Sequence, residues 1–274
     1  MVVTCILKGG LGNQLFQIFA TVAYALQRNR RFVLPNYKGM LGIDRKSIRP
    51  SYWNTLFIKL APYIKLPDNV TNFKENESHT YSKLPEYNNI CLKGYFQHLR
   101  YFNEYSDKII NLIGIKDFQE DIQKRYTIKN TISLHVRIGD YKKSRNGFHN
   151  ILPLNYYIKS LENIITKTNK DDWTLSYCCE DQDIDNVNDM ARALQSNFPN
   201  LKFERLDNKL ADWQQMIYMS CCQHNIIANS TFSWWSAYFN NNSDKIVCYP
   251  GKWFGTNKDV SGMFDGLGWD RITV

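Results

Sequence analysis

The sequence predicts an α/β fold made of two Rossmann-like domains that face a cleft. The first reason is that the chain opens in the order strand, glycine turn, helix, strand, which is a βαβ unit. The second is that strands and helices alternate again in the second half, where another turn can face a ligand. The third is length, because 274 residues suffice for two domains, expected at 1–120 and 121–274.

The βαβ opening starts with a short buried strand at residues 2–7. Gly9-Gly10-Leu11-Gly12 predicts a tight turn, and residues 13–27 predict a helix, because apolar residues recur there every three or four positions. A strand at 31–34 follows. The turn lacks the third glycine and the acidic residue of a dinucleotide site, and no Lys-Ser/Thr pair follows it as in a phosphate P-loop. The glycines therefore bring the helix start and Asn13 close to a ligand without indicating NAD or ATP.

The rest of the first half has weaker signals. Residues 36–90 show little periodicity, which is typical both of acceptor loops and of ordinary insertions. A strand is expected at 92–97 and a helix at 101–115. The polar, charged stretch 116–130 is the expected link between the halves.

The clearest strand covers 132–138, within the run Thr-Ile-Ser-Leu-His-Val-Arg-Ile-Gly-Asp-Tyr. Apolar and polar residues alternate along it, so His135 and Arg137 are expected on one face with Cα atoms about 7 Å apart. Gly139 ends the strand and lets a ligand approach. Guanidinium groups bind oxyanions through paired N–H groups, which makes Arg137 a candidate phosphate ligand. A structural ion pair between Arg137 and Asp140 is the alternative.

Strands and helices then alternate to the end of the chain. Helices are expected at 154–168, 183–196, 212–222 and 232–239, and strands at 173–179, 202–206, 224–228 and 246–249. The strand at 246–249 is expected to close the sheet.

Asn229-Ser230-Thr231 separate the strand 224–228 from the helix after it. The free amide groups of a helix start, with the hydroxyl groups of Ser230 and Thr231, can bind an anion, although capping alone is the alternative. Because the carboxyl ends of parallel strands share one edge, Arg137 and this helix start are expected at one crevice. Together they could hold a diphosphate without a metal ion.

Asp181-Gln182-Asp183 has the Asp-x-Asp spacing with which some enzymes hold a divalent cation and a diphosphate. The same spacing is common at helix starts, so Asp181 or Asp183 is expected to cap the helix at 183–196. No metal site is predicted.

Composition narrows the class of protein further. The net charge of +8 suits an anionic ligand, but the basic residues are scattered, which disfavours nucleic acid as a partner. Seven cysteines without a Cys-x-x-Cys pair predict buried free thiols in a reducing compartment. No apolar run is long enough to span a membrane and no signal peptide is recognisable, so a soluble, cytoplasmic protein is expected.

Three blocks of the sequence resemble the signature blocks of glycosyltransferase family 11, the galactoside α-1,2-fucosyltransferases. They are Gly9-Gly10-Leu11-Gly12-Asn13-Gln14-Leu15-Phe16-Gln17, His135-Val136-Arg137-Ile138-Gly139-Asp140-Tyr141 and Asn229-Ser230-Thr231-Phe232-Ser233-Trp234-Trp235. Residues 92–97, 149–157 and 250–253 are similar too, so the likeness covers nearly the whole chain in the family's order.

This resemblance implies a GT-B fold and a metal-independent, inverting transfer of L-fucose from GDP-β-L-fucose to a hydroxyl group, the 2-hydroxyl of a galactoside glycan. It implies that the donor binds the C-terminal domain and the acceptor mostly the N-terminal one. No cofactor is implied beyond this co-substrate.

The resemblance also implies roles for single residues. Arg137 would hold the β-phosphate, His135 would lie near the guanine, and Asn13 would approach the reaction centre from the other domain. The general base stays open among Asp140, His149 and Asp181. The implied nucleotide-sugar ligands are His135, Arg137, Gly139, Asn229, Ser230, Thr231, Phe232 and Gln215, together with Gly10 and Gly12.

The chain departs from the family pattern at two positions. Most members carry a second arginine where this chain has Ile138, so its diphosphate clamp has one positive charge fewer. Many carry an acid where this chain has Gln215, whose amide can accept from guanine only through its carbonyl oxygen. Another nucleotide sugar, another linkage, and a non-catalytic glycan- or nucleotide-binding protein on the same fold therefore stay as alternatives.

Overall fold

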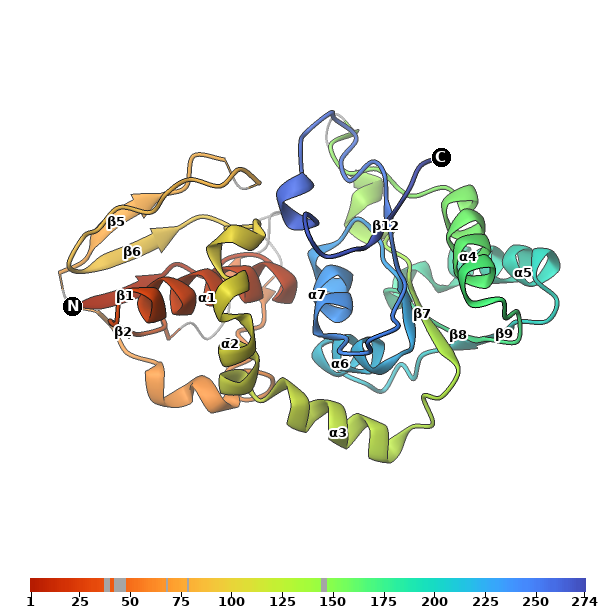
Figure 1. The fold of residues 1–274 in the computed structure, drawn as a ribbon, viewed down its shortest axis with the longest axis horizontal. Coiled ribbons are helices and arrows are strands. Elements are labelled where there is room, and N and C mark those ends of the chain that lie inside the picture. Colours follow the sequence, from red (N-terminus) through yellow and green to blue (C-terminus); the bar gives the residue numbers. More distant parts are fainter. Residues whose placement is uncertain (37–39, 42–47, 68, 78, 144–146) are drawn as a thin grey trace. The chain divides into compact units, whose positions relative to one another are not determined.

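The computed structural model describes residues 1–36, 40–41, 48–67, 69–77, 79–143 and 147–274 (Figure 1). Its α/β class, with a parallel sheet in each half, confirms the predicted fold class, two Rossmann-like units of the GT-B-like kind. One compact unit comprises Met1–Asp117 and Asp259–Leu267, and the other comprises Phe118–Lys258 and Gly268–Val274. The segment Asp259–Leu267 thus packs with the first unit, although the sequence analysis assigned everything after residue 120 to the second domain.

The first unit contains a four-stranded parallel sheet in the order β2-β1-β6-β5. Its strands are β1 (Val2–Cys5), β2 (Arg31–Phe32), β5 (Thr71–Lys74) and β6 (Ile90–Lys93), and its α-helices are α1 (Leu11–Gln27) and α2 (Ser106–Ile113). A separate antiparallel pair joins β3 (Met40–Leu41) to β4 (Ile48–Arg49). The predicted first helix is confirmed, and α1 is buried along most of its length because its apolar residues repeat at helical spacing.

Two expectations for the first half were misplaced. The strand expected at 92–97 ends at Lys93, and the chain then turns through Phe96, whose φ is +53°. The helix expected at 101–115 starts only at Ser106, after two 3-10 turns.

In the described part of 36–90, regular structure is limited to short strands and the 3-10 helix Ile58–Tyr63. The polar stretch expected to link the halves is largely the helix α3 (Ile115–Arg125).

The second unit contains a six-stranded parallel sheet in the order β12-β11-β10-β7-β8-β9. Its strands are β7 (Thr131–His135), β8 (Thr174–Cys178), β9 (Lys202–Arg205), β10 (His224–Ile226), β11 (Val247–Pro250) and β12 (Asp270–Ile272). Its helices are α4 (Leu154–Thr168), α5 (Ile184–Asn197), α6 (Asp212–Cys221) and α7 (Thr231–Phe239). The predicted helices and strands of this half are therefore present, with ends shifted by a few residues.

Two details of the second sheet differ from expectation. β7 ends at His135, and after one further ladder bond from Val136 to Cys178 the chain bends through Gly139, whose φ is +26°. The strand at 246–249 was expected to close the sheet, which was wrong, because β12 pairs beyond β11 at the edge. β12 has only three residues and no alternating pattern, so its sequence carries no strand signal.

The core of the second unit holds the site-bearing segments in place. Ile132 and Leu134 of β7 belong to its hydrophobic core, and Trp234 and Trp235 of α7 are fully buried. Fully buried tryptophan side chains anchor a helix strongly, since truncating one costs about 3–5 kcal/mol. The start of α7 is therefore held in place beside the end of β10, the strand that precedes it.

The seven cysteines are all free thiols, as predicted. None of the helices within the described ranges is both long and apolar enough to cross a lipid bilayer.

Candidate functional site

Two segments singled out in the sequence meet at the carboxyl ends of β7 and β10, which are neighbours in the sheet. The hydroxyl group of Tyr141 donates a hydrogen bond to the carbonyl oxygen of Asn229, at 2.8 Å. The rings of His135 and Phe232 lie 5.5 Å apart between centroids. The segment after β7 and the start of α7 therefore line one edge of the sheet, where parallel α/β folds bind their ligands.

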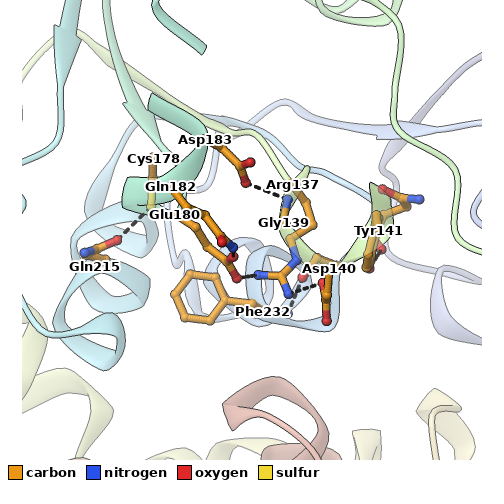
Figure 2. A network of polar contacts seen from close by, with 12 residues as sticks. Arg137, Gly139, Asp140, Tyr141, Cys178, Glu180, Gln182, Asp183, Gln215 and Phe232 are labelled. Carbon is orange, nitrogen blue, oxygen red and sulfur yellow. Dashed lines mark hydrogen bonds and ion pairs between the residues drawn. The ribbon is translucent and has the colours of Figure 1, made fainter. Parts of the chain in front are cut away.

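Arg137 lies at this edge, and its guanidinium group contacts two carboxylates (Figure 2). Its Nη2 atom lies 2.6 Å from Oδ1 of Asp140, and its Nη1 atom donates to Oε1 of Glu180. Burial lowers the pKa of Arg137, but Glu180 and Asp140 more than offset this and raise it above its ordinary value. The side chain is thus held charged, and the ion pair with Asp140 foreseen as an alternative is present.

Glu180 was missed by the sequence analysis. The ladder pairs His135 of β7 with Cys178 of β8, so Arg137 and Glu180 stand at equivalent positions two residues further on. The Oε2 atom of Glu180 also accepts a hydrogen bond from Nε2 of Gln182, at 2.6 Å. The sequence signal that could have identified Glu180 was its position just after the strand β8. Using that signal required knowing that β7 and β8 are neighbours in the sheet.

Asp183 is buried and binds the turn that follows Arg137. Its Oδ2 atom accepts from the backbone N–H of Gly139 at 2.5 Å, and its Oδ1 atom lies 3.6 Å from Nζ of Lys142. The expectation that Asp181 or Asp183 is the N-cap of the next helix is confirmed in position for Asp183. The Asp183 side chain makes no capping bond, because Gly139 and Lys142 engage it instead.

The two carboxylates of the Asp-x-Asp sequence are turned to different partners. Asp181 pairs with Arg205 at the end of β9, while Asp183 faces Gly139. Within the described ranges, no three His, Cys, Asp or Glu side chains come together in a geometry that could hold a metal ion.

His135 is 5% exposed, and its Nδ1 atom has no hydrogen-bond partner among the described residues. Burial, together with the positive charge of Arg137, lowers the pKa of His135 to about 3. The imidazole is therefore neutral near pH 7. Its ring is packed beside Phe232 and can make hydrogen bonds but carries no charge.

His149 lies close to the Arg137 turn through Tyr141. The rings of Tyr141 and His149 are stacked, with centroids 4.4 Å apart and an interplanar angle of 13°. Burial lowers the pKa of His149, Asp140 raises it and Arg137 lowers it, with a net downward shift. Of the base candidates, Asp140 and His149 are thus both near Arg137, whereas Asp181 is engaged by Arg205.

The start of α7 has the expected cap. The hydroxyl group of Ser230 accepts from the backbone N–H of Phe232 at 3.3 Å, and Thr231 is the first helical residue. Asn229 is buried, and its amide donates to the carbonyl oxygens of Asn150 and Trp253, at 2.9 and 3.0 Å. Asn229 therefore ties two loops to the site.

Gln215 has both ends of its amide occupied, and Figure 2 shows its contact with Cys178. Its Nε2 atom donates to the carbonyl oxygen of Leu210 at 2.9 Å, and its Oε1 atom accepts from the thiol of Cys178 at 2.8 Å. Burial raises the pKa of Cys178 to about 12, which keeps the thiol protonated as a donor. The amide is therefore locked in one orientation.

In the first unit, Asn13 lies at the start of α1, beside the carboxyl end of β1. Its Oδ1 atom accepts from Nε2 of Gln97 at 2.8 Å, a partner that the sequence analysis did not identify. Gly9 has φ of +80°, and a Cβ atom there would collide with the Asn13 side chain. Gly10 is the N-cap of α1 and Gly12 is buried in its first turn.

The loop that presents Gln97 is held by a buried carboxylate. Glu75, which follows β5, accepts from the backbone N–H groups of Tyr95 at 2.6 Å and of Phe96 at 2.9 Å. These bonds stabilise the left-handed backbone of Phe96 immediately before Gln97. Glu75, at the end of β5, therefore fixes the loop after β6 that carries Gln97, and in this way it supports the Asn13–Gln97 pair.

Comparisons with known proteins agree with this picture. The family model described as Glycosyl transferase family 11 matches residues 2–253. The O-antigen biosynthesis glycosyltransferase WbnK of Escherichia coli is 32% identical, over 94% of this chain and 97% of that protein. An alpha-1,2-colitosyltransferase of Escherichia coli is 27% identical, over 92% of each chain. Among solved structures, POFUT1 in complex with GDP-fucose is similar with a TM-score of 0.48 and 13% identity, covering 93% of this chain and 97% of that one.

Proposed function

The chain belongs to glycosyl transferase family 11, and on that premise we propose that it transfers L-fucose from GDP-β-L-fucose to the 2-hydroxyl group of a galactoside residue in a glycan. That it is a glycosyltransferase follows from the family. The donor sugar, the nucleotide and the acceptor hydroxyl are the proposal.

The observation that carries the proposal is the position of Arg137. Its guanidinium is mostly buried, stays charged, and lies at the sheet edge beside the capped start of α7. Guanidinium groups and helix N-termini are the two protein elements that bind phosphate oxygens best. This pairing supports a nucleoside diphosphate leaving group in the second unit.

Arg137 and the start of α7 form a phosphate clamp that the proposed reaction requires. As the acceptor hydroxyl attacks the anomeric carbon, the bond from that carbon to the β-phosphate breaks and negative charge grows on the leaving phosphate. Arg137 and the amide groups at the start of α7 would stabilise this charge most when the bond is breaking, which lowers the barrier. A β-linked donor and an α-linked product together mean inversion at the anomeric carbon.

The proton of the acceptor hydroxyl needs a destination. Asp140 and His149 both lie near Arg137, and the neutral imidazole of His149 is able to accept a proton near pH 7. The carboxylate of Asp140 is already held in an ion pair with Arg137. We therefore favour His149 over Asp140 as the base, and we propose that Asn13 contacts the reacting sugar from the first unit.

A second donor deserves direct comparison, because one relative is named as an alpha-1,2-colitosyltransferase. Colitose has the structure of L-fucose without the 3-hydroxyl group. A site that binds a sugar hydroxyl through buried polar groups discriminates strongly against the analogue that lacks it. The two donors thus differ by one testable contact.

The test is incubation with GDP-fucose, GDP-colitose and UDP-galactose, each with a panel of galactosides, read by mass spectrometry and linkage analysis. The proposal predicts α-1,2-fucosylated products from GDP-fucose, with undiminished yield in EDTA because no metal ion is invoked. Faster transfer of colitose would identify the second donor. The proposal is wrong if no donor in the guanosine series is consumed, or if EDTA abolishes transfer and Mg²⁺ or Mn²⁺ restores it.

A further inference from the structure

The guanidinium group of Arg137 already has an anionic partner on each terminal nitrogen atom. Nη1 donates to Glu180, and Nη2 lies 2.6 Å from Asp140 (Figure 2). The side chain is only 18% exposed. A phosphate bound in the bidentate manner needs two of the N–H groups that fan out from this fork. A diphosphate that binds both Nη atoms in this way therefore competes with a carboxylate at each of them.

Glu180 is the partner better able to leave. Asp140 lies three residues after Arg137 on the same short turn, so it stays with the guanidinium wherever that turn goes. Glu180 follows the neighbouring strand, so its attachment to the chain is independent of the Arg137 turn. Its side chain is 35% exposed, against 50% for Asp140, so its place in the chain and not its exposure distinguishes it. Apart from Arg137, the side-chain donor to its carboxylate is Gln182, which is exposed and belongs to the same turn as Glu180. The pair Glu180–Gln182 is thus able to move together into solvent.

The rest of this turn is anchored without Glu180. Asp183 accepts from the backbone of Gly139 at 2.5 Å and lies 3.6 Å from Lys142. Gly139 also provides the space that Glu180 occupies, because a Cβ atom at that position would collide with Oε2 of Glu180. Glu180 is therefore able to rotate away while the backbone of the turn keeps its place.

We propose that Glu180 occupies the donor-phosphate position on Arg137 in the nucleotide-free protein and is displaced by the diphosphate, so that it limits donor affinity. The inference rests on the proposed function, because it concerns how the same clamp is regulated.

The decisive variant is Glu180→Gln, which keeps the length of the side chain and an oxygen that accepts from Arg137 but removes the charge. The matched control is Asp181→Asn, because Asp181 is the next residue, is 80% exposed and pairs with Arg205 instead. In calorimetric titrations with GDP, Glu180→Gln should lower Kd about fivefold, the effect typical of one partly exposed charge pair. Asp181→Asn should change Kd by less than about twofold. If Glu180→Gln binds GDP no better than the native chain, Glu180 serves to orient Arg137 and the proposal is overturned.

Titration with inorganic pyrophosphate separates this inference from the identity of the donor. If the native chain fails to bind GDP, the proposed donor is wrong, but the ratio of pyrophosphate affinities in native and Glu180→Gln proteins still decides the inference. Tighter pyrophosphate binding by the variant supports it, and equal binding, or binding by neither protein, overturns it. In an Arg137→Gln background the gain from Glu180→Gln should vanish, and its persistence would show a general charge effect instead.

Discussion

Tyr141 and Asn229 connect two segments of the proposed donor site: the hydroxyl group of Tyr141 donates to the carbonyl oxygen of Asn229 at 2.8 Å. One residue lies on the turn after β7, and the other immediately precedes the cap of α7. Burial raises the pKa of Tyr141 to about 12, so the hydroxyl group remains a donor at all ordinary pH values. The bond thereby holds the Arg137 turn against the helix start that is proposed to share its ligand.

Replacing Tyr141 by Phe should weaken this connection while keeping the stacked ring. We expect a loss of about 1 kcal/mol in the free energy of unfolding, the usual value for one hydrogen bond, with a severalfold higher Kd for GDP. Denaturant unfolding and calorimetry would measure the two effects. Tyr177→Phe is the control, because it loses a comparable bond to Asn188 away from the site. Unchanged GDP binding in Tyr141→Phe would show that the two segments are held together by other contacts.

Arg137→Ala tests the clamp itself. We expect kcat to fall by a factor on the order of 100 or more, equivalent to about 3 kcal/mol, as when an oxyanion-hole donor is removed. Steady-state kinetics would measure the loss, and circular dichroism would verify folding. Arg205→Ala is the matched control, since Arg205 is paired with Asp181 outside the proposed contacts. A folded Arg137→Ala protein with near-native turnover would falsify the assigned role.

His135 should make stability depend on pH. Its pKa is about 3 in the folded chain and about 6.5 when unfolded, so below pH 6.5 the unfolded state binds more protons than the folded state. Stability is therefore complete above pH 6.5 and is lost as pH falls toward 3, by at most about 1.4 kcal/mol per pH unit. His224, whose pKa burial lowers to about 4, adds to the same slope.

The measurement for His135 is the free energy of unfolding at several pH values between 7 and 5, in the native chain and in His135→Asn. Removing the imidazole should make the dependence shallower by about 1 kcal/mol per pH unit, while the contribution of His224 remains. The difference in slope is the readout, so a general loss of stability in the variant does not affect it. Equal slopes would mean that His135 has the same pKa in the folded and the unfolded protein.

Much of the fold followed from local patterns in the sequence. The apolar spacing of α1 and the alternation around β7 were sufficient to place both elements. The sequence pattern predicted one buried face for β7, whereas all five of its residues are buried, and most residues of α1 are buried too. β12 could not be found this way, since three residues contain no periodicity and its position depends on pairing with β11. The end of β7 was also missed, because the strand stops where Gly139 bends the chain toward Asp183.

The sequence predicted those features of the site that follow from the parallel order of the strands, but not those that depend on strand register or on tertiary contacts. Arg137 and Ser230 were expected at one sheet edge because parallel strands end on the same side, and the segments that carry them do meet there. Glu180 was not foreseen, because its contact with Arg137 depends on the register of β7 and β8. Asp183 has the residue type and position of a helix cap, but a tertiary contact with Gly139 takes its carboxylate. A side chain suited to capping a helix does not form the capping bond where a partner distant in the sequence binds the same group more strongly.

Gln97 offers a test of the first unit. Its Nε2 atom donates to Oδ1 of Asn13 at 2.8 Å and so fixes which way the Asn13 amide faces. We expect Gln97→Leu to lower kcat about tenfold, because a misplaced amide near the reacting sugar loses its alignment with it. Kd for GDP should stay the same, since the proposed phosphate contacts lie in the second unit. In an Asn13→Ala background the same change should have no further effect on kcat, as expected of residues that act as a unit. A full additional loss in that background, or a weakened affinity for GDP, would mean that Gln97 acts through the stability of the loop held by Glu75 and not through Asn13.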